Sequence, residues 1–262
     1  MTNPAGCDEA TRSVGTSPYM ANEKRAGQVP ASAFEVPYGD GYVTSEKSIS
    51  VENLVKRYST PMGERTVLDN ISFSVRPGEK IAVLGQNGAG KSTLVKLVAG
   101  VEPLTSGRIH RGLSMSWPVG FSGGLEHAMT GHDNIRFISR VYGVPVEKAV
   151  AIVDDFAELG QHLHMPMATY STGMRTRLAF GLTLAVDFEC FLIDETISVG
   201  DQRFRRKCHE ELFVKRQHCA MILVSHDTQV IRQYCNRALV LKAGRGRVFD
   251  DVELALSIYS TL

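Results

Sequence analysis

A glycine-rich loop lies between the apolar run at residues 81–84 and a second mostly apolar segment, residues 94–98, and it restricts the folds open to this chain. Glycines allow the backbone to approach phosphates closely, so that successive N–H groups point into one concavity. The start of a following helix adds the positive end of its dipole. The spacing predicts a phosphate-binding loop (P-loop) made of Gly85, Gln86, Asn87, Gly88, Ala89, Gly90, Lys91, Ser92 and Thr93.

Two side chains of the loop have expected roles in holding a nucleoside triphosphate. Lys91 is placed to reach the β and γ phosphates, and the hydroxyl of Ser92 suits the Mg²⁺ that accompanies them. A glycine-rich strand-to-helix turn without a ligand is the alternative, but the full spacing favours the nucleotide. The expected ligands are therefore ATP or a similar nucleotide and Mg²⁺.

Composition excludes several classes of partner. The 29 basic and 28 acidic residues give a net charge of +1, so no overall field recruits nucleic acid, and we expect no nucleic-acid partner. Apolar stretches are interrupted by charges before they reach membrane-spanning length, and the N-terminus lacks a signal-peptide core. We therefore expect a chain that stays in the cytoplasm and contacts a membrane only through another protein.

The pattern of the chain changes near residue 48. Residues 1–48 mix Gly, Pro, Ser, Ala and charges without a period, which predicts a disordered N-terminal arm, and Met20 is an alternative start. From Ile49 to Leu262 apolar runs alternate with helical spacing, which predicts one α/β domain. Expected strands lie at residues 49–56, 71–75, 81–84, 107–110, 190–193, 221–224 and 238–241, and a helical insert lies at about residues 125–186.

Polar groups follow two of the predicted strands. Asp194 and Glu195 end the run 190–193, where open α/β sheets place ligands. Asp194 suits the Mg²⁺ shell, commonly through water, and Glu195 suits a general base for the attacking water. Helix capping is the alternative for this pair. His226 follows the run 221–224 and is expected to hold the γ-phosphate and the water, with a purely structural histidine as the alternative.

A second phosphate-binding feature precedes the helix predicted at residues 175–186. Ser171, the backbone N–H of Gly173 and the helix N-terminus together suit a phosphate. The P-loop and this second loop of the same chain do not easily bind one and the same nucleotide.

The order of these motifs resembles the ATP-binding cassette (ABC) family over residues 49–262. The resemblance implies a P-loop NTPase fold with a RecA-like core, an antiparallel β subdomain and a helical subdomain. It also implies a head-to-tail homodimer, in which Ser171 and Gly173 of one subunit close over ATP held by Lys91 of the other. Tyr58 matches the aromatic residue that stacks on adenine, and Asp201 ends the loop that crosses the dimer interface.

The departures from the usual family motifs are informative. Residues 170–174 read Tyr-Ser-Thr-Gly-Met where Leu-Ser-Gly-Gly-Gln is usual, and residues 117–127 lack the glutamine that senses Mg²⁺ and the transport partner. Together with the segments 58–63, 116–131 and 194–201, they resemble the ATPase subunits of bacterial capsular polysaccharide exporters.

That closer resemblance implies an ATP-hydrolysing subunit bound to an integral membrane permease at the cytoplasmic face of the inner membrane, with polysaccharide as the transported substrate. The alternatives are an O-antigen or other glycan exporter and a soluble cassette ATPase acting on DNA or the ribosome. Soluble cassette ATPases of that kind tend to carry two cassettes or a long coiled-coil insert, and this chain has neither, which favours the transporter. Trp117 is expected to contact the permease, with packing under the helical insert as the alternative, in which case Phe121 or Glu126 takes that role.

Overall fold

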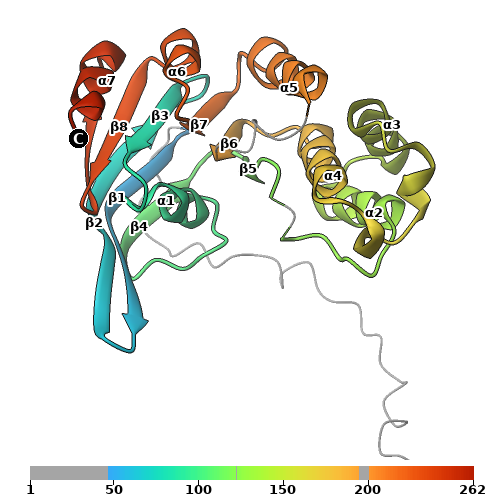
Figure 1. Cartoon of the computed structure of the whole chain (residues 1–262), viewed down its shortest axis with the longest axis horizontal. Helices are drawn as coiled ribbons and strands as arrows, with labels where there is room; N and C mark the ends of the chain where they lie inside the picture. Colours follow the sequence, from blue (N-terminus) through green and yellow to red (C-terminus); the bar gives the residue numbers. More distant parts are fainter. Residues whose placement is uncertain (1–46, 122, 195–200) are drawn as a thin grey trace, which may run out of the picture. The chain divides into compact units, whose positions relative to one another are not determined.

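The computed structural model describes residues 47–121, 123–194 and 201–262 (Figure 1). The arm predicted at residues 1–48 lies outside these ranges except for its last two residues, and so does Glu195.

A six-stranded sheet carries the P-loop. Its strand order is β5-β6-β7-β3-β8-β9, and all neighbours are parallel except the β8–β9 pair (Figure 1). The strands are β5 (Met115–Pro118), β6 (Cys190–Asp194), β7 (Ala220–Val224), β3 (Lys80–Gly85), β8 (Arg237–Lys242) and β9 (Arg245–Phe249). Because neighbouring parallel strands cannot be joined by a short turn, the chain crosses over between them, and these crossover connections contain helices.

The central strands are buried on both faces, which explains why they read as continuous apolar runs. Along β3, Ala82 and Leu84 join one core cluster while Ile81 and Val83 join the other. The second cluster is covered by α1 (Lys91–Val98), which contacts β3, β6 and β7. The first is covered by helices that include α6 (Thr228–Tyr234) and α7 (Val252–Ser260).

A three-stranded antiparallel sheet, β2-β1-β4, packs with α1 in the second cluster. Its strands are β1 (Ile49–Thr60), β2 (Gly63–Val75) and β4 (Ser106–Arg111). The first two are longer than the sequence pattern predicts. The turn between them occupies only Pro61 and Met62, with Thr60 opposite Gly63, so residues expected in a loop continue the hairpin ladder.

The predicted helical insert consists of α2 (Gly131–Tyr142), α3 (Val146–Ala157) and α4 (Thr172–Ala185), with short 3₁₀ turns at Gly160–His164 and Met167–Thr169. Helix α2 has Thr130 as its N-cap, whose side chain accepts a hydrogen bond from Asp133 N, and Gly143 in the left-handed conformation as its C-cap. Helix α4 is buried on all sides from Leu178 to Ala185. It therefore forms the centre of this helical layer, where it contacts both α2 and α3.

The C-terminal part contains one strand that the sequence pattern did not predict. Helix α5 (Gln202–His209) continues into a π-helical turn (Glu210–Val214). Strand β8 is followed by a turn at Ala243 and Gly244, which leads into β9. The run Arg-Gly-Arg in β9 has the composition of a loop, and it forms a strand because it pairs with the edge of β8. Within the described ranges, no helix is both long and apolar enough to cross a membrane.

Candidate nucleotide-binding site

Three of the expected nucleotide-binding elements, namely the P-loop, Asp194 and His226, lie at one edge of the large sheet. Strands β3, β6 and β7 run parallel, with Val83 opposite Val224 and Val224 opposite Asp194. Their carboxyl ends therefore deliver the P-loop, Asp194 and His226 to the same edge, which is where open α/β sheets bind ligands.

The P-loop has the geometry of a phosphate cradle. Gly90 is the N-cap of α1 with a φ of 102°, and a Cβ on it would lie 2.8 Å from Leu68 Cδ2, so only glycine fits. Since the N-cap has no side chain, no capping group competes for the first N–H groups of the helix. Lys91 is only 7% exposed, and its Nζ donates to Gly85 O at 2.7 Å and to Gln86 O at 3.2 Å, which holds the ammonium over the loop.

The two expected metal ligands lie together. Ser92 Oγ donates to Asp194 Oδ1 at 3.4 Å, although the two residues are 102 positions apart in the sequence. A hydroxyl and a carboxylate are the oxygen ligands that suit Mg²⁺. The donor set therefore fits the metal that accompanies ATP.

Tyr58, the residue expected to stack on adenine, is held by two residues that the sequence reading missed. Its hydroxyl donates to Glu102 Oε1, and Lys56 Nζ lies 4.7 Å from the centre of its ring. Lys56 in turn pairs with Glu102 at 3.0 Å and donates to Pro103 O at 2.7 Å. Lys56 thus occupies one face of the Tyr58 ring.

The same contacts shift two pKa values. Burial, followed by the hydrogen bond to Glu102, raises the pKa of Tyr58. The hydrogen bond from Tyr58 lowers the pKa of Glu102, and Lys56 lowers it further against the opposing effect of burial. Both shifts favour a neutral phenol donating to an ionised carboxylate.

His226 is also held by an unexpected partner. Its Nδ1 lies 3.0 Å from the hydroxyl of Tyr259, which belongs to α7 and is 33 positions away. The sequence pattern does not indicate which side chain of α7 reaches the sheet edge.

The second predicted phosphate-binding feature lies at the N-terminus of α4. Ser171 is its N-cap and accepts a hydrogen bond from Met174 N at 3.2 Å, and both Ser171 and Thr172 are exposed. Helix α4 lies with α2 and α3, on a different part of the molecule from α1 (Figure 1). The fold thus leaves this helix start open to solvent.

Tyr170, the first departure in this motif, has a packing role. It is 2% exposed, and its hydroxyl donates to His162 O at 2.5 Å. A Cβ on Gly131 would lie 2.5 Å from the same hydroxyl. A side chain at position 131 would therefore clash with the Tyr170 hydroxyl, so this one contact explains why Tyr170 and Gly131 occur together.

Asp201 anchors the start of α5. Its side chain accepts a hydrogen bond from Phe204 N at 2.8 Å, and its carboxylate pairs with Arg177 of α4 at 3.2 Å. The hydrogen bond from Phe204 N is the main cause that lowers the pKa of Asp201. Asp201 therefore links α5, which follows the predicted interface loop, to α4, whose N-cap is Ser171.

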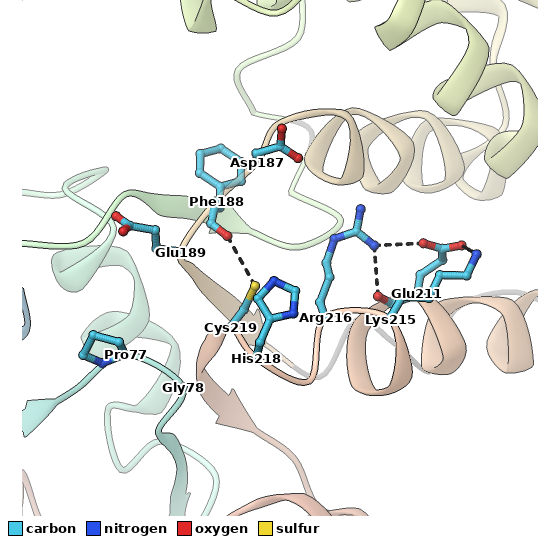
Figure 2. A pocket seen from close by; sticks show the side chains of 10 residues that line it. All are labelled: Pro77, Gly78, Asp187, Phe188, Glu189, Glu211, Lys215, Arg216, His218 and Cys219. Atoms are coloured by element: carbon cyan, nitrogen blue, oxygen red, sulfur yellow. Dashed lines mark hydrogen bonds and ion pairs between the residues drawn. The ribbon is translucent and has the colours of Figure 1, made fainter.

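A cavity of about 620 Å³ lies at the opposite edge of the sheet. Figure 2 shows it between the starts of β3, β6 and β7, with Arg216 directed toward Glu211 and Cys219 toward Phe188 O. Its charged lining residues all belong to ion pairs, namely Asp187, Glu189, Glu211, Lys215 and Arg216. Since parallel sheets bind ligands at the other edge, this cavity is not the nucleotide site.

Comparisons with known proteins support the same assignment. The ABC transporter family matches residues 68–198. The chain is 52% identical to the "Capsule polysaccharide export ATP-binding protein CtrD" of Neisseria meningitidis serogroup B, over 82% of this chain and 99% of that protein. The chain belongs to the ABC transporter family.

Other ABC proteins are similar to this one. The "ATP-binding protein BexA" of Haemophilus influenzae is 50% identical over 81% of this chain and 98% of its own length. Among solved structures, the one titled "Structure of ATP binding subunit of ABC transporter" is 21% identical, with a TM-score of 0.67 over 80% of this chain and 94% of that chain. The predicted ABC nucleotide-binding fold is confirmed.

Proposed function

We propose that this protein is the ATP-hydrolysing subunit of an ABC transporter that exports capsular or a related cell-surface polysaccharide across the bacterial inner membrane. The observation that carries this is the 52% identity over 99% of the Neisseria capsule export protein. A second candidate is another glycan, since the "Teichoic acids export ATP-binding protein TagH" of Bacillus anthracis is 35% identical over 73% of this chain and 36% of its own length.

The residues at the sheet edge suit ATP and Mg²⁺. The P-loop N–H groups and Lys91 would hold the phosphates, Ser92 and Asp194 would hold the metal, and Tyr58 would stack on adenine through the face opposite Lys56. Mg²⁺ bound with ATP supplies neutralisation of charge on the β and γ phosphate oxygens. Glu195 would orient and deprotonate the attacking water, and His226 would hold it near the γ-phosphate.

A homodimer would complete the site. The solvent-exposed N-terminus of α4 suits a phosphate of a nucleotide held by a second copy of the chain. Ser171 and Gly173 of one subunit would then close over ATP bound to Lys91 of the other. ATP would join the two subunits, and its hydrolysis would release them.

An encapsulated strain lacking this protein tests the proposal. Expression of the wild-type chain is expected to restore surface polysaccharide, whereas the Lys91→Ala variant should leave the polymer inside the cell. Surface and internal polymer are measured separately with a polymer-specific antibody. Normal surface capsule in the deletion strain, with another surface glycan lost instead, would favour the second candidate.

The residues around Tyr58 lead to a prediction about nucleotide affinity. Glu102→Gln removes the ion pair with Lys56 and weakens the hydrogen bond that the Tyr58 hydroxyl donates, so the Tyr58 ring is held less firmly. We expect the Kd for ATP to rise about fivefold, somewhat less than for Tyr58→Ala, which removes a base-stacking interaction worth about 1–3 kcal/mol. Both are measured by isothermal titration calorimetry.

Glu64→Gln is the matched control. It changes the neighbouring ion pair with Arg57, which is 3.9 Å long and exposed, so ATP affinity should stay unchanged. Unchanged affinity in Glu102→Gln would show that Tyr58 needs no support from this pair.

A permease contact is the other requirement of the proposal. Trp117 is half-buried, with its ring 5.5 Å from the ring of Phe188 and 5.6 Å from that of Tyr142. This arrangement favours the packing alternative for Trp117. By contrast, Phe137 and Val141 of α2 are 53% and 54% exposed and lie one helical turn apart. We therefore place the permease contact on this face of α2.

The double variant Phe137→Ser/Val141→Ser is expected to keep its ATPase activity and folding in isolation but to abolish export and co-purification with the permease. Val214→Ser, at a residue that is 54% exposed on another element, is the control for the double variant and should export normally. Normal export by the double variant would mean that the permease contact lies elsewhere, with Phe121 the next position to test.

The Trp117→Ala variant should instead lower the free energy of unfolding by about 2 kcal/mol, because it empties a half-buried aromatic site.

A further inference from the structure

The hydrogen bond between His226 and Tyr259 bears on how the histidine presents its proton. The imidazole ring has two nitrogens, and the hydrogen bond made by one decides which of them carries the proton in the neutral form. Nδ1 of His226 lies 3.0 Å from Tyr259 Oη, within hydrogen-bond distance. If the phenol donates, Nδ1 is unprotonated and the proton sits on Nε2, the nitrogen on the far side of the ring.

The helix that carries Tyr259 is fixed to the sheet. Helix α7 contacts β8 and also β3, the strand that leads into the P-loop. Its N-terminus is capped by Asp251, which accepts from Glu253 N at 2.9 Å and Leu254 N at 3.1 Å. Arg232 of α6 donates to the carboxylate of Glu253 at 2.9 Å.

The tyrosine ring itself is half-buried and packs against the first core cluster, with Ala255 and Leu256 of α7 buried in that cluster. A ring wedged in this way has little rotamer freedom, so its hydroxyl is held at one place beside the end of β7. His226, by contrast, is exposed, and its orientation depends on the partners of its ring nitrogens.

We propose that Tyr259 is a positioning residue for His226: its hydroxyl donates to Nδ1, keeps the proton on Nε2 and so aims an N–H donor at the γ-phosphate and the attacking water. This rests on the role of His226 in the proposed function. A donor held in place before the reaction stabilises the charge that develops on the phosphate without reorganisation at the moment of transfer. The terminal helix thereby becomes part of the ATPase site.

Tyr259→Phe tests this in the full-length protein, because it removes one hydroxyl and keeps the packed ring. The kcat for ATP hydrolysis is expected to fall about five- to tenfold, the equivalent of one lost hydrogen bond, with the KM for ATP unchanged. Ring ¹⁵N chemical shifts of labelled histidine give a second readout. The wild type should show His226 protonated on Nε2, and the variant should show a mixture of the two tautomers.

The structure offers a matched control in a second tyrosine–histidine pair. The hydroxyl of Tyr234 lies 2.9 Å from His209 Nε2, away from the nucleotide edge. Tyr234→Phe removes an equivalent bond and should leave kcat unchanged. A similar fall in kcat for both variants would overturn the proposal, because it would reveal a general loss of packing.

His226→Ala separates this proposal from the proposed function. If His226→Ala is nearly inactive while Tyr259→Phe keeps wild-type kcat and tautomer, the positioning role is wrong and the role of His226 stands. If His226→Ala itself hydrolyses ATP normally, both roles are wrong. In the double variant His226→Ala/Tyr259→Phe, no further loss is expected beyond that of His226→Ala, since the hydroxyl acts only through the histidine.

Discussion

Glu195→Gln is expected to slow ATP hydrolysis about 10²- to 10⁴-fold while ATP affinity stays unchanged, because a general base contributes to the chemical step and not to binding. Glu195 directly follows Asp194 in the sequence, and Asp194 Oδ1 accepts a hydrogen bond from Ser92 Oγ at 3.4 Å at the end of β6. Glutamine keeps the shape of the side chain and loses its basicity. The variant should therefore accumulate as an ATP-bound dimer.

Steady-state hydrolysis, ATP titration and size-exclusion chromatography with ATP and Mg²⁺ measure these three properties. Glu147→Gln, a matched change at an exposed position in the first turn of α3, should leave all three as in the wild type. Turnover of Glu195→Gln within a few-fold of wild type would rule out a general base at this position and direct attention to Asp194 and His226.

Mixing two inactive variants is expected to restore ATP hydrolysis if the site is shared between subunits. Lys91→Ala removes the ammonium held over the P-loop, and Ser171→Arg blocks the N-terminus of α4, so each variant alone should lose at least about a hundredfold in kcat. In a heterodimer, Lys91 of one subunit faces Ser171 of the other at one of the two sites. An equimolar mixture should therefore regain about a quarter of wild-type activity, given random pairing in a two-fold dimer.

The control replaces one partner of the mixture. When the Lys91→Ala subunit also carries Ser171→Arg, no heterodimer contains an intact pair, and the mixture should remain inactive. A Lys91→Ala and Ser171→Arg mixture that stays inactive at concentrations where ATP-dependent dimers form would contradict the head-to-tail arrangement.

Sequence alone was sufficient for the parts of this protein in which neighbouring residues act together. The P-loop spacing predicted the phosphate cradle, and the apolar runs predicted the buried strands that end at Asp194 and just before His226, because local spacing fixes both backbone geometry and strand burial. The limits of β1 and β2 were wrong, since the hairpin register depends on pairing across the turn. Strand β9 was missed because its polar sequence becomes a strand only beside β8.

Only the tertiary structure decided how the functional side chains are held. Tyr58 and Glu102 are 44 positions apart, and His226 and Tyr259 are 33 apart, and no periodic pattern links either pair. Such contacts arise where the fold brings separate elements to one edge of a sheet, and their geometry depends on packing over the whole domain. The spacing of residues along the chain therefore predicts which residues form the candidate nucleotide site, and the tertiary contacts show which neighbours orient them.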